Sequence, residues 1–295
     1  MDFIELAIPV LVFLLMFIIG ANLEKSDIEK IKVQQKKILV ITIGQMLLLP
    51  LCALLIIKVM QPNSLVAGGL LLVSLCPGGA VSNIYSFLAK ANMALSVSLT
   101  AVNGIVSVFV LPLVMLIVFP SLLGLDLSLK HIIIKQGLQL LLLLLLPIVF
   151  GMALRNMKRT LMLNLMPVLE KVGALGLVLL LLAIFFKFYQ KIIVQSSSLL
   201  LLALTFTIVS LFIAYCLSRL LKLDKQDEAA VVIELPVRNL ALAALIAVSL
   251  FQNSDYLLFA AVFFVIQTPI MLCIVAWYRF SLLKKARSLK LKSCA

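Results

Sequence analysis

The chain has 295 residues, of which 64% are hydrophobic and 13% charged, and its 25 lysines and arginines outnumber 12 acidic residues for a formal net charge of +13. So high an apolar fraction excludes an ordinary soluble domain. The apolar runs are about 20 residues long, which fits spanning helices, whereas a β-barrel would show alternating segments of about 10 residues. We therefore expect an all-α polytopic membrane protein.

Nine apolar runs follow one another along the chain, and each predicts one transmembrane helix. The first is interpreted as a span and not as a signal peptide, because its leader carries Asp2 and Glu5 and no basic residue. The third and eighth runs are interrupted. The predicted spans are 2–21, 38–60, 65–88, 92–119, 131–154, 164–190, 196–221, 226–250 and 254–282.

The basic residues are distributed unevenly between alternate connectors. With the N-terminus outside, the cytoplasmic side holds 18 of them, counting Arg279 at the inner end of the last span, and the outward connectors hold five. The positive-inside rule therefore predicts a multi-pass protein of the cell membrane (inner or plasma membrane), with N-terminus outside and a basic cytoplasmic tail at 283–295. The positive charge thus reflects topology, and no nucleic-acid partner is expected.

Sites of other kinds find little support in the sequence. The five cysteines are scattered, without a CxxC pair, and the single histidine, His131, lies at a predicted outer helix end. Glu234 is the only carboxylate deep in a predicted span, so paired catalytic acids are missing and we do not expect an enzyme. No cofactor and no obligate protein partner are indicated; the lipid bilayer is the expected surrounding.

Two interrupted spans carry the functional signal. The first contains "CPGGAVSN" (76–83), in which Pro77, Gly78 and Gly79 break the helix, and the second contains "ELPVRN" (234–239), which is broken at Pro236. Unwound backbone at membrane depth is tolerated only where protein or a water-filled cavity satisfies its polar groups.

The two breaks occupy corresponding places in a diverged internal repeat. From Asn83 to Pro112 is 29 residues, and from Asn239 to Pro269 is 30 residues. An offset of five spans gives the two halves inverted topology, and broken helices at matching positions of inverted repeats indicate a transporter's binding site near the bilayer midplane.

These motifs, together with "LAKANMALSVSLT" (88–100) and "ELPVRNLALA" (234–243), resemble the bile acid:sodium symporter family, in its nine-helix, N-out form. The resemblance implies panel-type helices in 1–37 and 131–195, core-type helices in 38–130 and 196–282, and two discontinuous helices that cross in the core. It also implies sodium-coupled symport of a small or amphipathic organic anion by alternating access.

The resemblance implies two sodium sites, of which the first is complete in this chain. Its expected ligands supply only hydroxyl, amide, carboxylate and carbonyl oxygens, which suit a hard cation that takes about five or six oxygens. They are Ser82, Asn83, Ser96, Thr100 and Glu234. Ser96 and Thr100 are four residues apart and share one helix face.

The second site is degenerate. It maps to Gln45, Glu234, Leu235, Val237 and Arg238, where arginine replaces the family's glutamine. A guanidinium has five donors and no acceptor, so it cannot ligate sodium. We expect it to occupy this site itself, pairing with Glu234 and bonding to Gln45 and the unwound carbonyls, so that one sodium at most is coupled.

Other roles for Arg238 remain open. It could hold an anionic group of the substrate, together with Asn239 in the substrate cavity, or it could neutralise Glu234 and weaken the first site. The alternative functions are a sodium-independent uniporter, a proton-coupled carrier or exporter of the arsenite type, which Cys76 invites, and a non-transporting membrane sensor.

Overall fold

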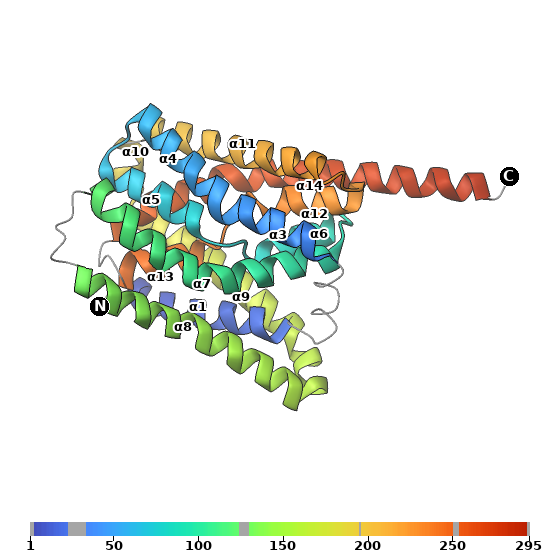
Figure 1. Ribbon diagram of the computed structural model, residues 1–295, viewed down its shortest axis with the longest axis horizontal. Helices are drawn as coiled ribbons and strands as arrows, with labels where there is room; N and C mark the ends of the chain where they lie inside the picture. Colours follow the sequence, from blue (N-terminus) through green and yellow to red (C-terminus); the bar gives the residue numbers. More distant parts are fainter. Residues whose placement is uncertain (1–2, 23–33, 124–129, 195, 250–253, 294–295) are drawn as a thin grey trace.

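The structure is a computed structural model that describes residues 3–22, 34–123, 130–194, 196–249 and 254–293. Within these ranges it consists of helices that run side by side, with short turns between them (Figure 1). The helices are α1 (Phe3–Asn22), α3 (Gln35–Ile43), η1 (Gly44–Leu48), α4 (Leu49–Met60), α5 (Ser64–Leu75), α6 (Ala80–Leu88), α7 (Met93–Leu123), α8 (Lys130–Met157), α9 (Arg159–Lys187), α10 (Tyr189–Val194), α11 (Ser196–Leu220), α12 (Lys225–Glu234), α13 (Leu240–Ser249), η3 (Ser254–Tyr256) and α14 (Leu257–Ser293).

Each predicted span is helical over most of its described residues, with the third and eighth interrupted, and the helices are longer at several ends. α9 begins at Arg159, five residues before the predicted start at 164, and α14 continues to Ser293, past the predicted end at 282. Both extensions add basic residues, which are good helix formers. Lys25, Lys30 and Lys32 of the first inner connector, and Cys294, lie outside the described residues, as does the side chain of His131.

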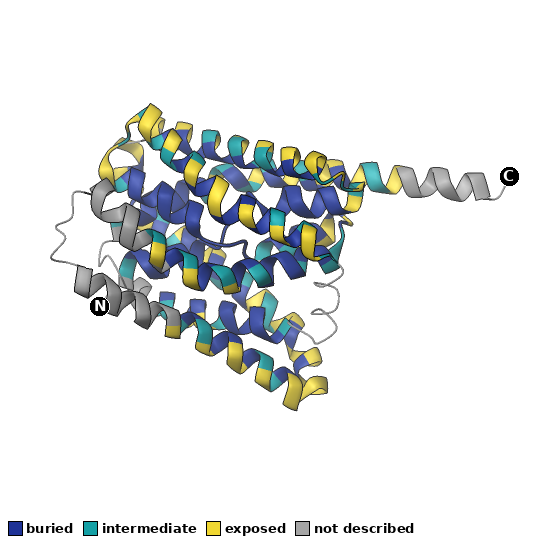
Figure 2. Ribbon diagram, viewed as in Figure 1, coloured by how far each residue is buried: buried dark blue, intermediate teal, exposed yellow. Residues whose placement is uncertain are grey.

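The helices are apolar enough to cross a membrane. Five helical stretches of the described chain are long and apolar enough to cross a membrane, namely 35–60, 93–111, 159–187, 197–220 and 257–284. Three shorter apolar helices lie at 7–22, 64–75 and 142–157. Large apolar side chains such as Leu146, Phe186 and Phe212 are exposed. Exposed positions lie along the outer helices of the bundle (Figure 2). A bilayer removes that surface from water, so the protein is a polytopic helical membrane protein.

α1, α8 and α9 pack on one another along one side of the bundle (Figure 1). Two glycines bring α1 and α8 into close contact, because a Cβ on Gly20 would overlap the Ile148 carbonyl and a Cβ on Gly151 would overlap the Phe17 carbonyl. Small residues at such contacts let helix backbones approach closely where the surrounding lipid is as apolar as the side chains. The other long helices, α7, α11 and α14, pack against α5 and α12, whereas α13 packs mainly against α1 and α14.

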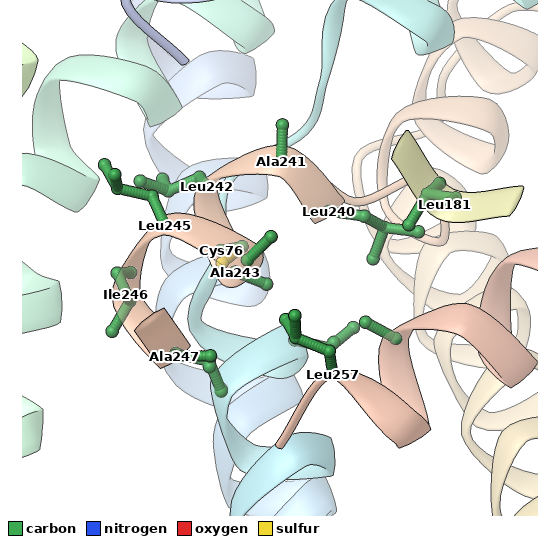
Figure 3. Packing of buried hydrophobic residues seen from close by; sticks show 14 of the residues in the cluster. Cys76, Leu181, Leu240, Ala241, Leu242, Ala243, Leu245, Ile246, Ala247 and Leu257 are labelled. Atoms are coloured by element: carbon green, nitrogen blue, oxygen red, sulfur yellow. The ribbon is translucent and has the colours of Figure 1, made fainter. Parts of the chain in front are cut away.

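Both interrupted spans are buried in the middle of the bundle. α5 ends at Leu75 and α6 begins at Ala80, while α12 ends at Glu234 and α13 begins at Leu240. Figure 3 shows Cys76, at the first break, among the leucines and alanines of α13. Apolar side chains surround much of the two breaks, so their polar groups are satisfied by one another and by buried polar side chains of neighbouring helices.

The second predicted span contains a feature that the sequence analysis did not anticipate. Between α3 and α4 the helix widens into one π-helical turn, and the Leu49 N–H donates to the Gly44 carbonyl five residues back. Pro50 follows directly; it has no N–H and its ring crowds the preceding turn, so a wider turn relieves the conflict. The turn leaves Gln45 fully buried and facing the interior.

Candidate functional site

The two breaks cross and are joined through their backbones. The Asn239 N–H donates to the Pro77 carbonyl at 2.9 Å, and Gly78 and Arg238 form an isolated antiparallel bridge. The crossing thus consists of the segments 76–79 and 235–239, where the sequence places Pro77, Gly78, Gly79 and Pro236. After it, α6 and α13 begin, so two helix N-termini adjoin the crossing.

Glu234, the last residue of α12, is fully buried beside the crossing and is surrounded by hydroxyl groups. The Thr100 hydroxyl lies 2.9 Å from Oε1 and 3.1 Å from Oε2. The Ser82 hydroxyl lies 2.6 Å from Oε2 and 2.7 Å from the Gly79 carbonyl, and it can donate to one of these at a time. A carboxylate accepts such bonds strongly, which offsets part of the cost of burying its charge.

Asn83 extends this cluster of oxygens. Its Oδ1 accepts from the Ser96 hydroxyl at 2.8 Å and lies 3.3 Å from the Thr100 hydroxyl. The structure therefore brings together all five residues of the first predicted site, from α6, α7 and α12. Ser86, which was not predicted, joins them because its hydroxyl lies 3.0 Å from the Ser96 hydroxyl, which can donate to Asn83 or to Ser86 but not to both at once.

Gly78 allows the carboxylate to come so close to the first break. A Cβ built on Gly78 would overlap Oε1 of Glu234, whereas a Cβ on the neighbouring Gly79 would have its nearest contact at 3.4 Å, with Cα of Asn239. Gly78 is thus needed as glycine for contact with Glu234, and Gly79 is not.

Arg238 is 3% exposed and is held through one nitrogen. Its Nη1 donates to the Cys76 carbonyl at 3.0 Å. The surrounding donors set the orientation of the Gln45 amide, whose oxygen then accepts from Nη1 of Arg238 at 3.0 Å and from the Gly78 N–H at 2.7 Å. The amide nitrogen of Gln45 faces Asn103 at 2.7 Å, which is a hydrogen bond when Asn103 presents its oxygen there.

The expected pairing of Arg238 with Glu234 is wrong as a direct contact. Within the described part of the chain the two residues form no ion pair, and the expected contacts to Gln45 and to an unwound carbonyl are the ones that Arg238 makes. The reason is geometric: the hydroxyl groups of Ser82 and Thr100 already surround the carboxylate, and the backbone bridge at Arg238 directs its side chain toward Cys76.

The remaining predicted residues lie in the unwound segment. Leu235 and Val237 are buried, with their side chains in the apolar cluster that also contains Tyr85 and Leu99. The side-chain oxygen of Asn239 accepts from the Leu242 N–H at 3.1 Å and so caps α13, which leaves its amide NH2 as the group to offer to a ligand. Asn239 therefore has a structural role that the sequence analysis did not assign.

A polar stripe on α7 could have revealed the residues that were missed on that helix. Ser96, Thr100, Asn103 and Ser107 follow at intervals of four, three and four residues, all buried, and therefore share one face. Asn103 continues the line that starts at Ser96 and meets Gln45 across the bundle. The stripe thus connects the oxygen cluster to the surroundings of Arg238.

The chemistry of the oxygen cluster suits a hard monovalent cation. Carboxylate, hydroxyl and amide oxygens provide the donors, and within the described residues no group of three or more histidine, cysteine or acidic side chains could hold a transition metal. Arg238 itself supplies donors and a positive charge, which suit an anion, whereas the groups that it contacts, the Cys76 carbonyl and the Gln45 oxygen, are acceptors.

Comparisons with known proteins agree with these observations. The sequence profile described as the sodium bile acid symporter family matches residues 9–198, which is more than half of the chain. An uncharacterized sodium-dependent transporter, YocS, of Bacillus subtilis (strain 168) is 24% identical over 245 residues, 83% of this chain and 74% of that protein.

Two further relatives are longer proteins. A probable sodium/metabolite cotransporter of Arabidopsis thaliana, BASS1 of the chloroplast, is 28% identical over 79% of this chain and 57% of its own length. The hepatic sodium/bile acid cotransporter of Rattus norvegicus is 24% identical over 52% of this chain and 42% of its own length. This chain spans about half the length of these two relatives. The profile match covers more than half of the chain, and the crossing of two broken helices agrees with it. The chain therefore belongs to the sodium bile acid symporter family.

Proposed function

We propose that this protein is a secondary active transporter that couples the entry of a small or amphipathic organic anion to sodium by alternating access. In this proposal nine spans cross the membrane with the N-terminus outside and the C-terminus in the cytoplasm. The panel-type helices, within 1–37 and 131–195, move against the core-type helices, within 38–130 and 196–282.

The observation that carries the proposal is the oxygen cluster around Glu234. Three hydroxyl groups and one amide oxygen converge with a buried carboxylate from three helices, and two of those helices border the breaks. Sodium is the ion that we assign to this cluster, with Ser82, Asn83, Ser96, Thr100 and Glu234 as its ligands. The sodium dependence named for the Bacillus, Arabidopsis and rat relatives supports this choice.

We assign one sodium to each transport cycle. A second ion would have to lie near Gln45, Glu234 and the backbone at Leu235 and Val237, and the Nη1 group of Arg238 is 3.0 Å from the Gln45 amide. A permanent cation there repels sodium and already bonds to the group that would ligate it. Arg238 then substitutes for the charge of the missing ion.

Calorimetry of sodium binding to the purified protein tests the proposal. We expect one sodium for the wild type, two for Arg238→Gln, which restores the family's residue, and none for Glu234→Ala. Arg219→Gln, at an exposed arginine on α11, is the matched control and should bind as the wild type does.

Absence of sodium binding in the wild type would contradict the coupling. If Arg238→Gln then binds sodium and the wild type does not, Arg238 has disabled the site, and a uniporter or a proton-coupled carrier replaces the symporter. If neither binds sodium, the oxygen cluster is a packing network only.

A further inference from the structure

The guanidinium of Arg238 is satisfied on one side only. Both hydrogens of Nη1 have acceptors, the Cys76 carbonyl and the Gln45 oxygen, each at 3.0 Å. Nε and Nη2 are buried without a hydrogen-bond partner within the described part of the chain. A buried donor that has lost its water and gained no partner destabilises the protein, by more when it is charged.

The two unsatisfied nitrogens share one edge of the guanidinium plane. Because Nη1 lies on the side of Cδ, the N–H of Nε and one N–H of Nη2 point in the same direction. Two parallel N–H groups match the two oxygens of a carboxylate in a bidentate pair. If Arg238 only fastened the two breaks together, the contacts of Nη1 would suffice.

The balance of charges at the crossing favours a bound anion. Glu234 is engaged by Ser82 and Thr100 and forms no ion pair with Arg238 within the described residues. The N-termini of α6 and α13, of nine and ten residues, adjoin the same crossing and add partial positive charge. When one sodium ion neutralises Glu234, the positive charge of Arg238 remains unbalanced. A bound monoanion would neutralise it.

Resting on the sodium-coupled function above, we propose that the Nε–Nη2 edge of Arg238 binds the carboxylate group of the transported anion, side-on and through two hydrogen bonds. The substrate class is then a monocarboxylate, and the guanidinium both selects it and supplies the charge of a second cation. Nη1, fixed on Cys76 and Gln45, keeps the edge in one orientation, so little side-chain freedom is lost on binding.

The test observes the Arg238 Nε–H directly, in full-length protein labelled with ¹⁵N-arginine and reconstituted in nanodiscs with sodium present. The probes are acetate and benzoate, with acetamide and benzamide as neutral controls of the same shape. We expect the carboxylates to move the Nε–H proton resonance downfield by forming a charge-assisted bond, and the amides to leave it in place. Arg238→Lys identifies the resonance by its disappearance.

Titration by calorimetry gives the matching affinities. Arg238→Lys keeps the positive charge but removes the two parallel N–H groups of the guanidinium. Carboxylate binding should therefore weaken about tenfold to a hundredfold, as expected for the loss of charged hydrogen bonds. Arg219→Lys, the same substitution at an exposed site, should leave the affinity for the carboxylates unchanged. Sodium binding by Arg238→Lys shows that this variant is folded.

The proposal is overturned if neither carboxylate moves the wild-type resonance, which would mean that water alone occupies the edge. It is also overturned if Arg238→Lys binds the carboxylates as tightly as the wild type. Should Arg238→Lys not fold, the contrast between carboxylate and amide in the wild type still decides. Sodium binding measured in the same preparation separates the two proposals: sodium without carboxylate refutes only the subsite, and carboxylate without sodium refutes only the coupling.

Discussion

At the scale of single residues, the two buried charges of the crossing have different hydrogen-bond partners. Glu234 is surrounded by the hydroxyl groups of Ser82 and Thr100, and Arg238 is fixed by the Cys76 carbonyl and Gln45. A direct ion pair would have used both charges on each other. In the function proposed above, their separation leaves the carboxylate for sodium and the guanidinium for the anionic substrate.

Gly78 gives a prediction at this scale. Gly78→Ala should weaken sodium binding about tenfold or more, because the new methyl group overlaps Oε1 of Glu234 and displacing a packed group costs about 1–3 kcal/mol. Gly79→Ala is the matched control and should stay within about threefold of the wild type, since its Cβ meets only ordinary contacts. Sodium calorimetry on both variants compares them, and equal losses would contradict the assignment.

The sequence predicted the residue types at the site better than their contacts. The family resemblance implied five residues for the first site: Ser82, Asn83, Ser96, Thr100 and Glu234. Their side chains form a continuous series of contacts of 3.5 Å or less, which follows from the crossing of the two broken helices. The partner of Arg238 could not be read from the sequence. Its side-chain direction depends on the backbone bridge to Gly78, which lies 160 positions earlier in the chain.

At the scale of elements, the start of α12 ties several helices together at one end of the bundle. Asp224 caps the helix by accepting from the N–H groups of Gln226 and Asp227. Asp227, buried, pairs with Lys37 of α3 and accepts from Asn92 at 2.7 Å. Carboxylates in a first helical turn are also favoured by the helix dipole. These contacts fix the position of α12 along its own axis, and therefore also the position of Glu234 at its C-terminal end.

This junction predicts a difference between two lysine variants. Lys37→Met removes the counter-charge of Asp227, whose side chain is only 3% exposed, and should lower stability by about 1–3 kcal/mol. Lys191→Met breaks the pair with Asp255, whose side chain is 23% exposed and stays hydrated, and should cost less than about 1 kcal/mol. Denaturation in detergent measures both. A larger loss for Lys191→Met would show that burial does not set these costs.

At the scale of the whole molecule, polar contacts join connectors that the predicted topology places on the same side of the membrane. Lys37, Asn92 and Asp227, near three connectors that the charge pattern assigns to the inside, meet at one end. Lys191 and Asp255, near two connectors assigned to the outside, pair with each other. Contacts within each group require the chain to alternate between two ends, as Figure 1 also shows.

Which end faces the cytoplasm is a further prediction, from the positive-inside rule. In a cysteine-free background, Ser64→Cys at the start of α5 should react with an impermeant maleimide added to intact cells. Gln226→Cys, equally exposed at the start of α12, should react only after the membrane is opened. The reverse pattern would place the N-terminus inside and invert the direction assigned to the carrier.

The sequence by itself determined the class of the protein and the places where its helices break. Both follow from local causes: apolar length decides which segments leave water, and proline and glycine decide where helical hydrogen bonds fail. The tertiary structure alone decided the partners of the charged groups. Ser82 meets Glu234 across 152 positions, and Cys76 meets Arg238 across 162. Such pairs depend on how two unwound segments cross, and the physical reason is that buried polar groups take whichever partner the packed backbone brings within reach.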